Sequence, residues 1–338
     1  MAPTTAYRGP AGAERFSTVD RPTLVVDRRR AQTNIARMAD KARASGVRFR
    51  PHFKTHNDPV VGAWFRDAGV DAITVSSVEH AGTFAGAGWA DITIAFPLVT
   101  RAIPTVRDLA ERIRLGVLLD SPEAAAALAA VEAPVDVWMD VDCGYGRSGT
   151  PWDDADRLGE VAAAVARVPN GRLRGVLTHA GETYHATSAA GIAEIWGRTA
   201  ARAGAARDLV SAAAGMAGLQ VSVGDTPGCS VVERFDGVDE VRPGNFVYRD
   251  LQQLALGSCT EGDLALAIAC PVVGVYPARG EAVIHGGSVQ LSRDAAPGPD
   301  GTACFGRLAV VGPDGWRLKG LKNQAEGQAA LLYFDPEP

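Results

Sequence analysis

The chain has 338 residues, of which 46% are hydrophobic and 22% are charged, and its net charge is -5. This is the composition of an ordinary globular protein, long enough for one large domain and a smaller one. The acidic balance gives no reason to expect nucleic acid or a membrane surface as a partner.

Cysteine usage and the N-terminal segment favour the cytoplasm. The five cysteines are odd in number and form no Cys-x-x-Cys pair, so we expect reduced thiols and no disulfide framework. Residues Met1–Phe16 lack the positive and apolar regions of a signal peptide. No apolar run is long enough to span a bilayer, so we expect a cytoplasmic protein.

The chain begins with an irregular lead-in, residues 1–20, that is rich in polar residues, glycine and proline. A β-branched run at Thr23–Val26 follows, and then a helix with apolar residues on one face. Beyond it, eight candidate strands alternate with alanine-rich helices such as Asp153–Arg167 and Ala190–Ala217. The strands are Val47–Phe53, Ala72–Val75, Asp91–Ala95, Ile113–Leu119, Val135–Val141, Leu173–Thr178, Gln220–Val223 and Val238–Arg242.

Eight strands alternating with helices predict an α/β fold, a (β/α)8 barrel of the TIM type over residues 21–250. Alternation alone also fits an open, doubly wound sheet, but the strand count favours the barrel. Residues 251–338 differ, because strand-like runs separated by Gly, Pro and Asp turns predict a β-rich domain. The Thr23–Val26 strand is a candidate to join it. Its own candidate strands are Leu264–Tyr276, Ala282–Ile284, Ser288–Leu291, Arg307–Val311 and Ala329–Phe334.

The segment Arg50-Pro51-His52-Phe53-Lys54-Thr55-His56 carries the strongest chemical signal. Its lysine lies at the carboxyl end of the first predicted barrel strand, the end at which barrels build their active sites. A lysine held there on a rigid element can form a Schiff base with a carbonyl compound. A lone loop lysine is usually a solvated surface residue, but this mixture of basic, aromatic and histidine side chains is not ordinary loop composition.

The motif RPHFKTH resembles the cofactor-lysine segment of the D-threonine aldolase and eukaryotic-type D-serine dehydratase family. The resemblance extends from about Arg21 to Asp294. It implies a pyridoxal-phosphate enzyme of the alanine-racemase-like fold (fold type III), in which Lys54 holds the cofactor as a Schiff base. It also implies a homodimer, since in that fold the partner subunit completes the active site.

Two glycine-containing loops follow the seventh and eighth predicted strands, where such barrels commonly bind phosphate. The first contains Gly224 and Thr226, and the second contains Gly244 and Asn245. Glycine lets backbone N–H groups approach phosphate oxygens, and the threonine hydroxyl adds a donor. Each loop alone reads as a plain turn, but together they predict the phosphate site, and both resemble family segments. Asp225 departs from the family pattern, which has a small hydroxyl residue there.

An arginine follows the fifth predicted strand, in the segment Asp140–Gly149. This segment resembles the family's Asp-x-Gly-x-x-Arg-x-Gly pattern, which implies that Arg147 lies near the phenolic oxygen of the cofactor. A fixed cation would keep that oxygen ionised and the ring oriented. The alternative is a solvated surface arginine.

Aromatic and imidazole side chains follow the sixth predicted strand, at His179, Tyr184 and His185. Such residues can transfer protons or stack on a cofactor ring. We expect His179 nearest the ring and Tyr184 further out, whereas His185 equally fits a plain loop residue. Tyr248 is a further candidate for a phosphate contact. The alternative is that its ring only fills a gap between domains.

His56 is the candidate for the step that is specific to the substrate, with Lys54 as the other catalytic residue. It lies two residues beyond Lys54, and strand alternation would point both side chains to one face. A histidine there could take or give the proton of a β-hydroxyl group. His52 is expected to pack in support of the site.

Metal binding is where the sequence departs from the family it resembles. Those enzymes bind a divalent ion through a His-x-Cys or His-x-Asp segment near the C-terminus. No such segment follows His285, the last histidine, and Gln324–Gly327 has alanine where the family has histidine. We therefore predict no metal ligands in this sequence. A truncated C-terminus and a divergent member without the metal both stay open.

These features predict a pyridoxal-phosphate-dependent lyase that acts on D-configured 3-hydroxy amino acids by retro-aldol cleavage or dehydration. A small-molecule amino acid is thus the expected substrate. The first alternative is an amino acid racemase, which needs a second acid or base on the opposite face of the substrate. The second is a non-enzymatic pyridoxal-phosphate-binding protein, which the extra β-rich region argues against.

Overall fold

The computed structural model describes residues 16–276, 278, 281–287, 289–291, 294–297, 303–312, 315–318 and 331–332. These residues form two compact units. One unit is Ile35–Phe246, and the other joins the described residues up to Asn34 to those from Val247 onward. The domain bounds expected from the sequence stay a prediction.

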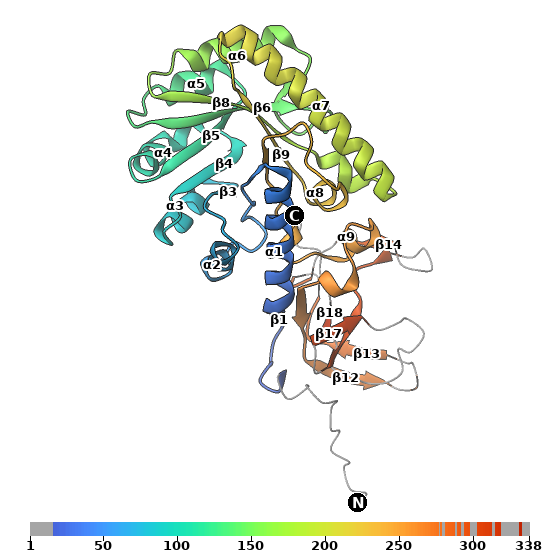
Figure 1. Cartoon of the computed structure of the whole chain (residues 1–338). Coiled ribbons are helices and arrows are strands. Elements are labelled where there is room, and N and C mark those ends of the chain that lie inside the picture. Colours follow the sequence, from blue (N-terminus) through green and yellow to red (C-terminus); the bar gives the residue numbers. More distant parts are fainter. Residues whose placement is uncertain are drawn as a thin grey trace, which may run out of the picture. The chain divides into compact units, whose positions relative to one another are not determined.

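Parallel strands build the larger unit (Figure 1). In spatial order they are β2 (Arg48–Phe49), β10 (Glu240–Val241), β9 (Gln220–Gly224), β8 (Gly171–His179), β6 (Val135–Asp142), β5 (Arg114–Leu119), β4 (Asp91–Pro97) and β3 (Ile73–Val75). A parallel bridge between His52 and Thr74 joins the first strand to the last. The ring therefore closes, and the predicted (β/α)8 barrel with its order of strands is confirmed.

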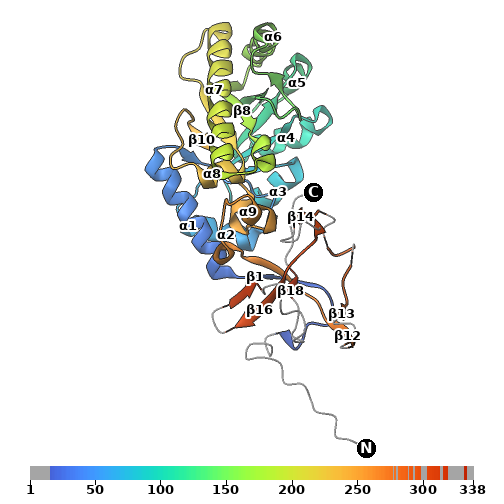
Figure 2. The same cartoon turned by 90° about the vertical axis from the view of Figure 1, so that its right-hand side faces the viewer.

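Helices follow the strands and lie outside the sheet (Figure 1). They are α1 (Arg28–Ser45), α2 (Pro59–Asp67), α3 (Val78–Gly86), α4 (Ile103–Ala110), α5 (Pro122–Leu128), α6 (Ala155–Ala166), α7 (Ala189–Ala214) and α8 (Thr226–Val231). Most begin at an Asp or Ser whose side chain accepts a backbone N–H of the first turn, as Ser188 does for α7. Figure 2 shows the long helix α7 running beside α6 and β8. Among the described residues, none of the helices is long and apolar enough to cross a membrane.

The core of the barrel needs strands that are buried on both faces, because helices cover the outside and side chains fill the inside. Strands β5 and β6 accordingly bury nearly every residue. The register of β8 against β6 shifts at Gly175, which has φ of 150°. A Cβ there would lie 1.9 Å from the carbonyl oxygen of Gln220, so only glycine fits.

The smaller unit is β-rich, and its strand β1 (Thr23–Val26) pairs antiparallel with β11 (Leu266–Ala269). Their sheet has the order β1, β11, β18 (Leu331–Leu332), β16 (Leu308–Gly312) and β17 (Gly315–Leu318), and Figure 2 shows β1, β18 and β16 together. Two ribbons are separate, β12 (Val272–Tyr276) with β13 (Glu281–Ile284), and β14 (Ala296–Pro297) with β15 (Ala303–Cys304). The helix α9 (Leu251–Ala255) precedes them.

Two strand predictions in this unit are wrong. Leu264–Tyr276 is not one strand, because the chain leaves β11 at Cys270 and Pro271, and proline has no N–H to continue a ladder. Ser288–Leu291 is also not a strand where it is described, since Val289 and Gln290 form a turn. There Gln290 donates its backbone N–H to the carbonyl of Gly287, 2.9 Å away, so the local bond replaces a ladder bond.

Candidate active site

Lys54 lies in a turn that follows the first barrel strand. Backbone bonds to strand β3 end at Phe53, whose N–H donates to the carbonyl of Thr74 over 2.8 Å. The N–H of Lys54 then donates to the imidazole Nδ1 of His52, 3.3 Å away. Because the lysine side chain is exposed and follows the carboxyl end of β2, it stands at the mouth of the barrel.

Two histidines share the electrostatic surroundings of Lys54. Burial, together with the charges of Arg147 and Lys54, lowers the pKa of His179 to about 3. Burial likewise lowers the pKa of His52 well below its usual value, with Lys54 and Arg242 acting in the same direction. Both imidazoles are therefore neutral, and both lie within reach of the same cations. His52 is thus a site residue that the sequence reasoning underrated.

Arg147 is presented by a loop that follows β6. The carboxylate of Asp142 accepts the backbone N–H groups of Gly144 and Gly146, at 2.8 and 3.0 Å. Both glycines have positive φ, 123° and 76°, so the loop turns back on that carboxylate. Arg147 itself is exposed, and its charge acts on His52 and His179. The charges of Lys54 and Arg147 thus both act on His179 at the barrel mouth.

Tyr145, on the same loop, forms one wall of the mouth. Its ring lies flat over Gly181, since a Cβ at position 181 would be 2.5 Å from the ring carbons. The ring meets His179 edge-on with 5.5 Å between centroids, and it stacks with His185 at 6.5 Å. The guanidinium of Arg147 is 5.7 Å from the ring centroid. Tyr145 is therefore a residue of the mouth that no sequence motif singled out.

The loop between β9 and α8 forms a cradle that suits a phosphate. A Cβ at Gly224 would lie 3.0 Å from the carbonyl oxygen of Arg242, so this position has room for little more than glycine. The hydroxyl of Thr226 is buried without a hydrogen-bond partner, and its residue is 0% exposed. The N–H of Thr226 reaches the hydroxyl of Tyr184 at 3.3 Å. A buried hydroxyl without a partner is unfavourable unless a ligand completes it.

The second predicted phosphate loop lies against the lysine segment. A Cβ at Gly244 would be 3.1 Å from the carbonyl oxygen of His52 and 3.3 Å from the hydroxyl of Thr55. Asn245, which is 2% exposed, follows it. These two loops and the turn of Lys54 therefore lie side by side at the barrel mouth.

Asp225 does not place a negative charge in this cradle. Its carboxylate turns toward the protein, where it accepts the hydroxyl of Thr183 at 2.7 Å and the N–H of Gly228 at 2.5 Å. Burial raises the pKa of Asp225 to about 7. The residue therefore begins helix α8 as its cap, which explains the departure from a small hydroxyl residue.

Asp140 adds a second buried carboxyl group near the mouth. It lies near the carboxyl end of strand β6, is 5% exposed, and has one carboxyl oxygen without a hydrogen-bond partner. Burial raises its pKa to about 6, while a hydrogen bond from Ser148 and the charge of Arg147 act in the opposite direction. Sequence reasoning assigned no role to this residue or to Arg242, whose partners Ser222 and Thr178 come from other strands.

His56 is placed apart from this group. The chain turns after His52, so the argument from strand alternation with Lys54 fails. The imidazole of His56 packs in an aromatic cluster, with centroid distances of 4.4 Å to Phe53 and 5.4 Å to Phe65. Its Nδ1 accepts the N–H of Asp58 at 3.4 Å, and its buried Nε2 has no partner. Burial lowers its pKa to about 3.

Two other predicted features stand outside the barrel unit. Tyr248 belongs to the β-rich unit, where its carbonyl accepts the N–H of Ala265 at 2.7 Å. The expected deviation from the family's metal signature, Gln324–Gly327, lies outside the described residues. Within the described part of the chain, no group of three or more His, Cys, Asp or Glu side chains could hold a metal ion.

Comparison with known protein families supports the resemblance seen in the sequence. The model of the alanine racemase N-terminal domain matches residues 26–252. The chain is 37% identical over 286 residues to the D-threo-3-hydroxyaspartate dehydratase of Delftia sp. (strain HT23), covering 82% of this chain and 74% of that one. The solved structure of that dehydratase gives a TM-score of 0.82 with 34% identity, covering 94% of this chain and 84% of the other.

Two further relatives are also lyases by name. The D-serine dehydratase of Dictyostelium discoideum is 26% identical over 304 residues, which cover 82% of this chain and 75% of that protein. The D-threonine aldolase of Arthrobacter sp. is 29% identical over 241 residues, which cover 70% of this chain and 62% of that protein. The resemblance predicted from the lysine motif is therefore confirmed.

Proposed function

Because the chain belongs to the family of the alanine racemase N-terminal domain, we propose that it is a pyridoxal-phosphate-dependent lyase acting on D-configured 3-hydroxy amino acids. The observation that carries this proposal is the convergence of Lys54, Arg147 and His179 at the carboxyl end of the barrel strands. The named relatives are dehydratases and an aldolase, and such enzymes share this class of substrate.

The residues at the mouth fit the cofactor. The unpartnered hydroxyl of Thr226 would offer a donor to a phosphate, and Gly224, Gly244 and Asn245 would line the same cradle. Tyr184, whose hydroxyl lies by the N–H of Thr226, borders the phosphate. A phosphate contact of Tyr248 remains a proposal that rests on the sequence alone.

Each side chain then has one task. When bound, the cofactor supplies an electron sink that stabilises negative charge at the substrate Cα. Lys54 would hold the cofactor covalently and, once released, take the proton from Cα in dehydration. Arg147 would hold the phenolic oxygen as an anion. The imidazole of His179, held neutral by burial, would pack on the ring.

His56 remains the proposed handler of the proton at the β-hydroxyl group. Since its Nδ1 accepts the N–H of Asp58, its proton is on Nε2, the buried nitrogen without a partner. That nitrogen can donate a hydrogen bond but cannot accept one. A neutral imidazole with a pKa of about 3 can offer this N–H as a hydrogen-bond donor to a leaving hydroxyl group, but it does not protonate that group and cannot act as the base of retro-aldol cleavage.

Racemisation stays a second candidate with less support. It requires an acid or base on the opposite face of the substrate, and the named relatives are lyases. A homodimer and a cytoplasmic location are further proposals, supported by the family resemblance and by the cysteine usage. We assign no step to a metal ion.

The test is an assay of the purified protein loaded with pyridoxal phosphate. It is incubated with D-threo-3-hydroxyaspartate, D-serine, D-threonine and both alanine enantiomers, with chelator and with added divalent ions. Keto acid and ammonia from the first two substrates, or glycine and an aldehyde from the third, support the lyase. Interconversion of alanine enantiomers alone would make the protein a racemase.

The matched control is Lys54→Ala. Borohydride reduction followed by mass spectrometry should find the cofactor attached to Lys54 in the wild type and nowhere in the variant. Attachment at another lysine would remove Lys54 from the proposal while leaving the enzyme class open.

A further inference from the structure

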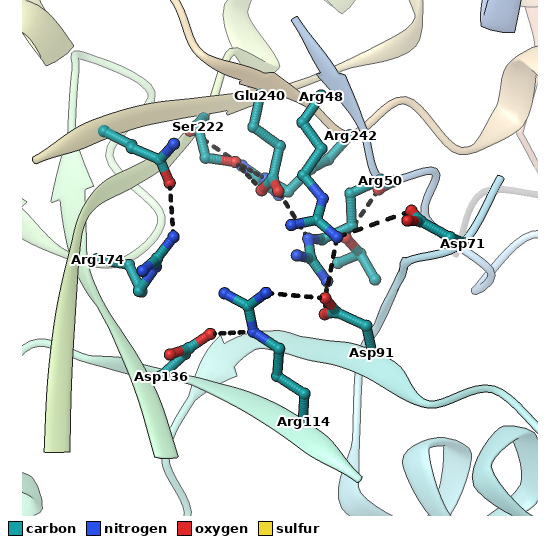
Figure 3. A network of polar contacts seen from close by, with 12 residues as sticks. Arg48, Arg50, Asp71, Asp91, Arg114, Asp136, Arg174, Ser222, Glu240 and Arg242 are labelled. Atoms are coloured by element: carbon teal, nitrogen blue, oxygen red, sulfur yellow. Dashed lines mark hydrogen bonds and ion pairs between the residues drawn. The ribbon is translucent and has the colours of Figure 1, made fainter. Parts of the chain in front are cut away.

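A column of polar side chains runs through the interior of the barrel (Figure 3). It consists of Arg50, Glu240, Ser222 and Arg242, which are 3%, 2%, 0% and 5% exposed. We call these four residues the polar column. Barrel interiors are usually filled by branched apolar residues, so a charged column there needs a reason.

The hydrogen bonds of the polar column have a defined direction. One carboxylate oxygen of Glu240 accepts a hydrogen bond from Nε of Arg50. The other accepts one from the hydroxyl of Ser222, and both distances are 2.7 Å. Since Ser222 gives its only proton to Glu240, its oxygen is free to accept Nε of Arg242, also at 2.7 Å. Glu240 thus orients Arg242 through the serine hydroxyl.

The upper end of the column reaches the barrel mouth. Nη2 of Arg242 donates to the carbonyl of Thr178 over 2.5 Å, one residue before His179. A Cβ at Gly224 would lie 3.1 Å from Nη1 of Arg242, so the guanidinium borders the proposed phosphate cradle. Its positive charge also contributes to the lowered pKa of His52 and of His179.

The column also determines whether this cation can persist in the interior. Burial lowers the pKa of Arg242 to about 10, and the carboxylate of Glu240 opposes that shift most strongly. At the lower end, Arg50 is bound by Glu240 and by Asp91, at 2.7 and 2.5 Å. A buried charge that loses its partner is strongly unfavourable, so the two ends depend on Glu240.

We propose that Glu240 is a positioning residue, which through Ser222 holds the guanidinium of Arg242 as a second fixed cation at the floor of the site, beside Arg147 on its wall. This inference rests on the proposed function, because the cation acts on the bound cofactor that the proposed function requires. A fixed cation favours the deprotonated form of a neighbouring titrating group. It therefore lowers the pH at which the bound cofactor titrates and strengthens the binding of its phosphate.

The test compares Glu240→Gln and Ser222→Ala with Asp136→Asn. Asp136 is also buried in the barrel interior and also binds an arginine, Nε of Arg114 at 2.7 Å, but it makes no contact with Ser222 or Arg242 (Figure 3). Three quantities are measured for each variant: the melting temperature without cofactor, the dissociation constant of pyridoxal phosphate, and the pH midpoint of its visible absorption when bound.

The expected result is a shift of the midpoint to higher pH in Glu240→Gln and Ser222→Ala, with roughly tenfold weaker cofactor binding, equivalent to one lost charge-assisted bond. Asp136→Asn should lower the melting temperature only.

If all three variants melt at lower temperature while the pH midpoint and the affinity for pyridoxal phosphate stay at wild-type values, the polar column only stabilises the barrel and the inference is wrong. Ser222→Ala keeps the test open should Glu240→Gln not fold. Failure of the wild type to bind pyridoxal phosphate would instead overturn the proposed function.

Discussion

The imidazole Nδ1 of His179 lies 2.5 Å from the carbonyl oxygen of Gly224, across the neighbouring strands β8 and β9. A carbonyl oxygen can only accept, so Nδ1 carries the proton and Nε2 is the bare nitrogen. The pKa of about 3 means that this neutral form persists through the physiological range. One backbone contact thereby sets both the tautomer and the charge of the residue proposed to pack on the cofactor.

We expect the side chain of His179 to keep the Nδ1-protonated neutral form between pH 5 and pH 8. Below its ordinary pKa of 6.5 a solvated histidine would gain a proton, whereas here burial and the charges of Arg147 and Lys54 prevent it. Long-range proton–nitrogen correlation spectra of 15N-histidine-labelled protein report the tautomer directly, with His179→Gln for assignment. An imidazolium signal for His179 at pH 6 would contradict the expectation.

Gly181→Ala should displace the ring of Tyr145 and destabilise the protein by about 1 kcal/mol, the low end of the cost of overpacking, because the ring is 37% exposed and can move. The new Cβ would lie 2.5 Å from the ring carbons, which no real contact tolerates. Thermal unfolding measures the loss. The matched control is Gly197→Ala within α7, where nothing lies within 4 Å of the added Cβ. There alanine should stabilise the helix by about 0.5–1 kcal/mol. Equal effects of the two substitutions would show that Tyr145 does not lie on Gly181.

Thr226→Val should weaken the binding of pyridoxal phosphate about tenfold and leave the melting temperature of the cofactor-free protein unchanged, because the hydroxyl has no protein partner to lose. Thr183→Val is the control. Its hydroxyl lies within hydrogen-bond distance of both the carbonyl of Ala180 and the carboxyl group of Asp225, at 2.8 and 2.7 Å. That variant should lose stability with or without cofactor. A cofactor affinity unchanged by Thr226→Val would remove Thr226 from the phosphate site.

The order of the barrel strands could be predicted because each strand is recognisable from its own residues, as an apolar run between turn residues. The two loops proposed to bind phosphate could be located for the same reason, since their position follows from strand order. The contacts of Arg242 could not be predicted, because its partners Ser222 and Thr178 come from other strands. A local rule also misplaced His56, because it assumed that strand alternation continues past Lys54, whereas the chain turns after His52.

His56→Phe should make the protein more tolerant of acid. The pKa of His56 is about 3 when folded, below the value of 6.5 of an unfolded histidine, so between these values the unfolded chain binds a proton that the folded protein does not. Stability is therefore lost as the pH falls through that range, and phenylalanine, which fits the cluster of Phe53 and Phe65, removes this loss. Melting temperatures of variant and wild type should diverge from pH 7 to pH 4.5 in favour of the variant.

The same variant tests the proposed catalytic role. If His56 donates to a leaving hydroxyl group, His56→Phe should lower kcat for dehydration while cofactor binding stays intact. Full activity with the altered acid tolerance would leave His56 as a packing residue only.

Asp225→Asn should show the opposite pH dependence. Burial raises the pKa of Asp225 to about 7, so between the ordinary value of 3.8 and 7 the folded protein holds a proton that the unfolded chain has lost. A group of this kind contributes stability that is fully present below pH 3.8 and is lost as the pH rises to 7, at about 1.4 kcal/mol per pH unit at most. Asparagine is neutral throughout and can still accept hydrogen bonds from Thr183 and Gly228.

The melting temperature of the Asp225→Asn variant should therefore rise relative to that of the wild type from pH 5 to pH 7, and the difference should be constant above pH 7.5. A difference that stays the same over the whole range would mean that the carboxyl group is ionised throughout, with Lys41 and Arg242, the cations that act on it, compensating its burial.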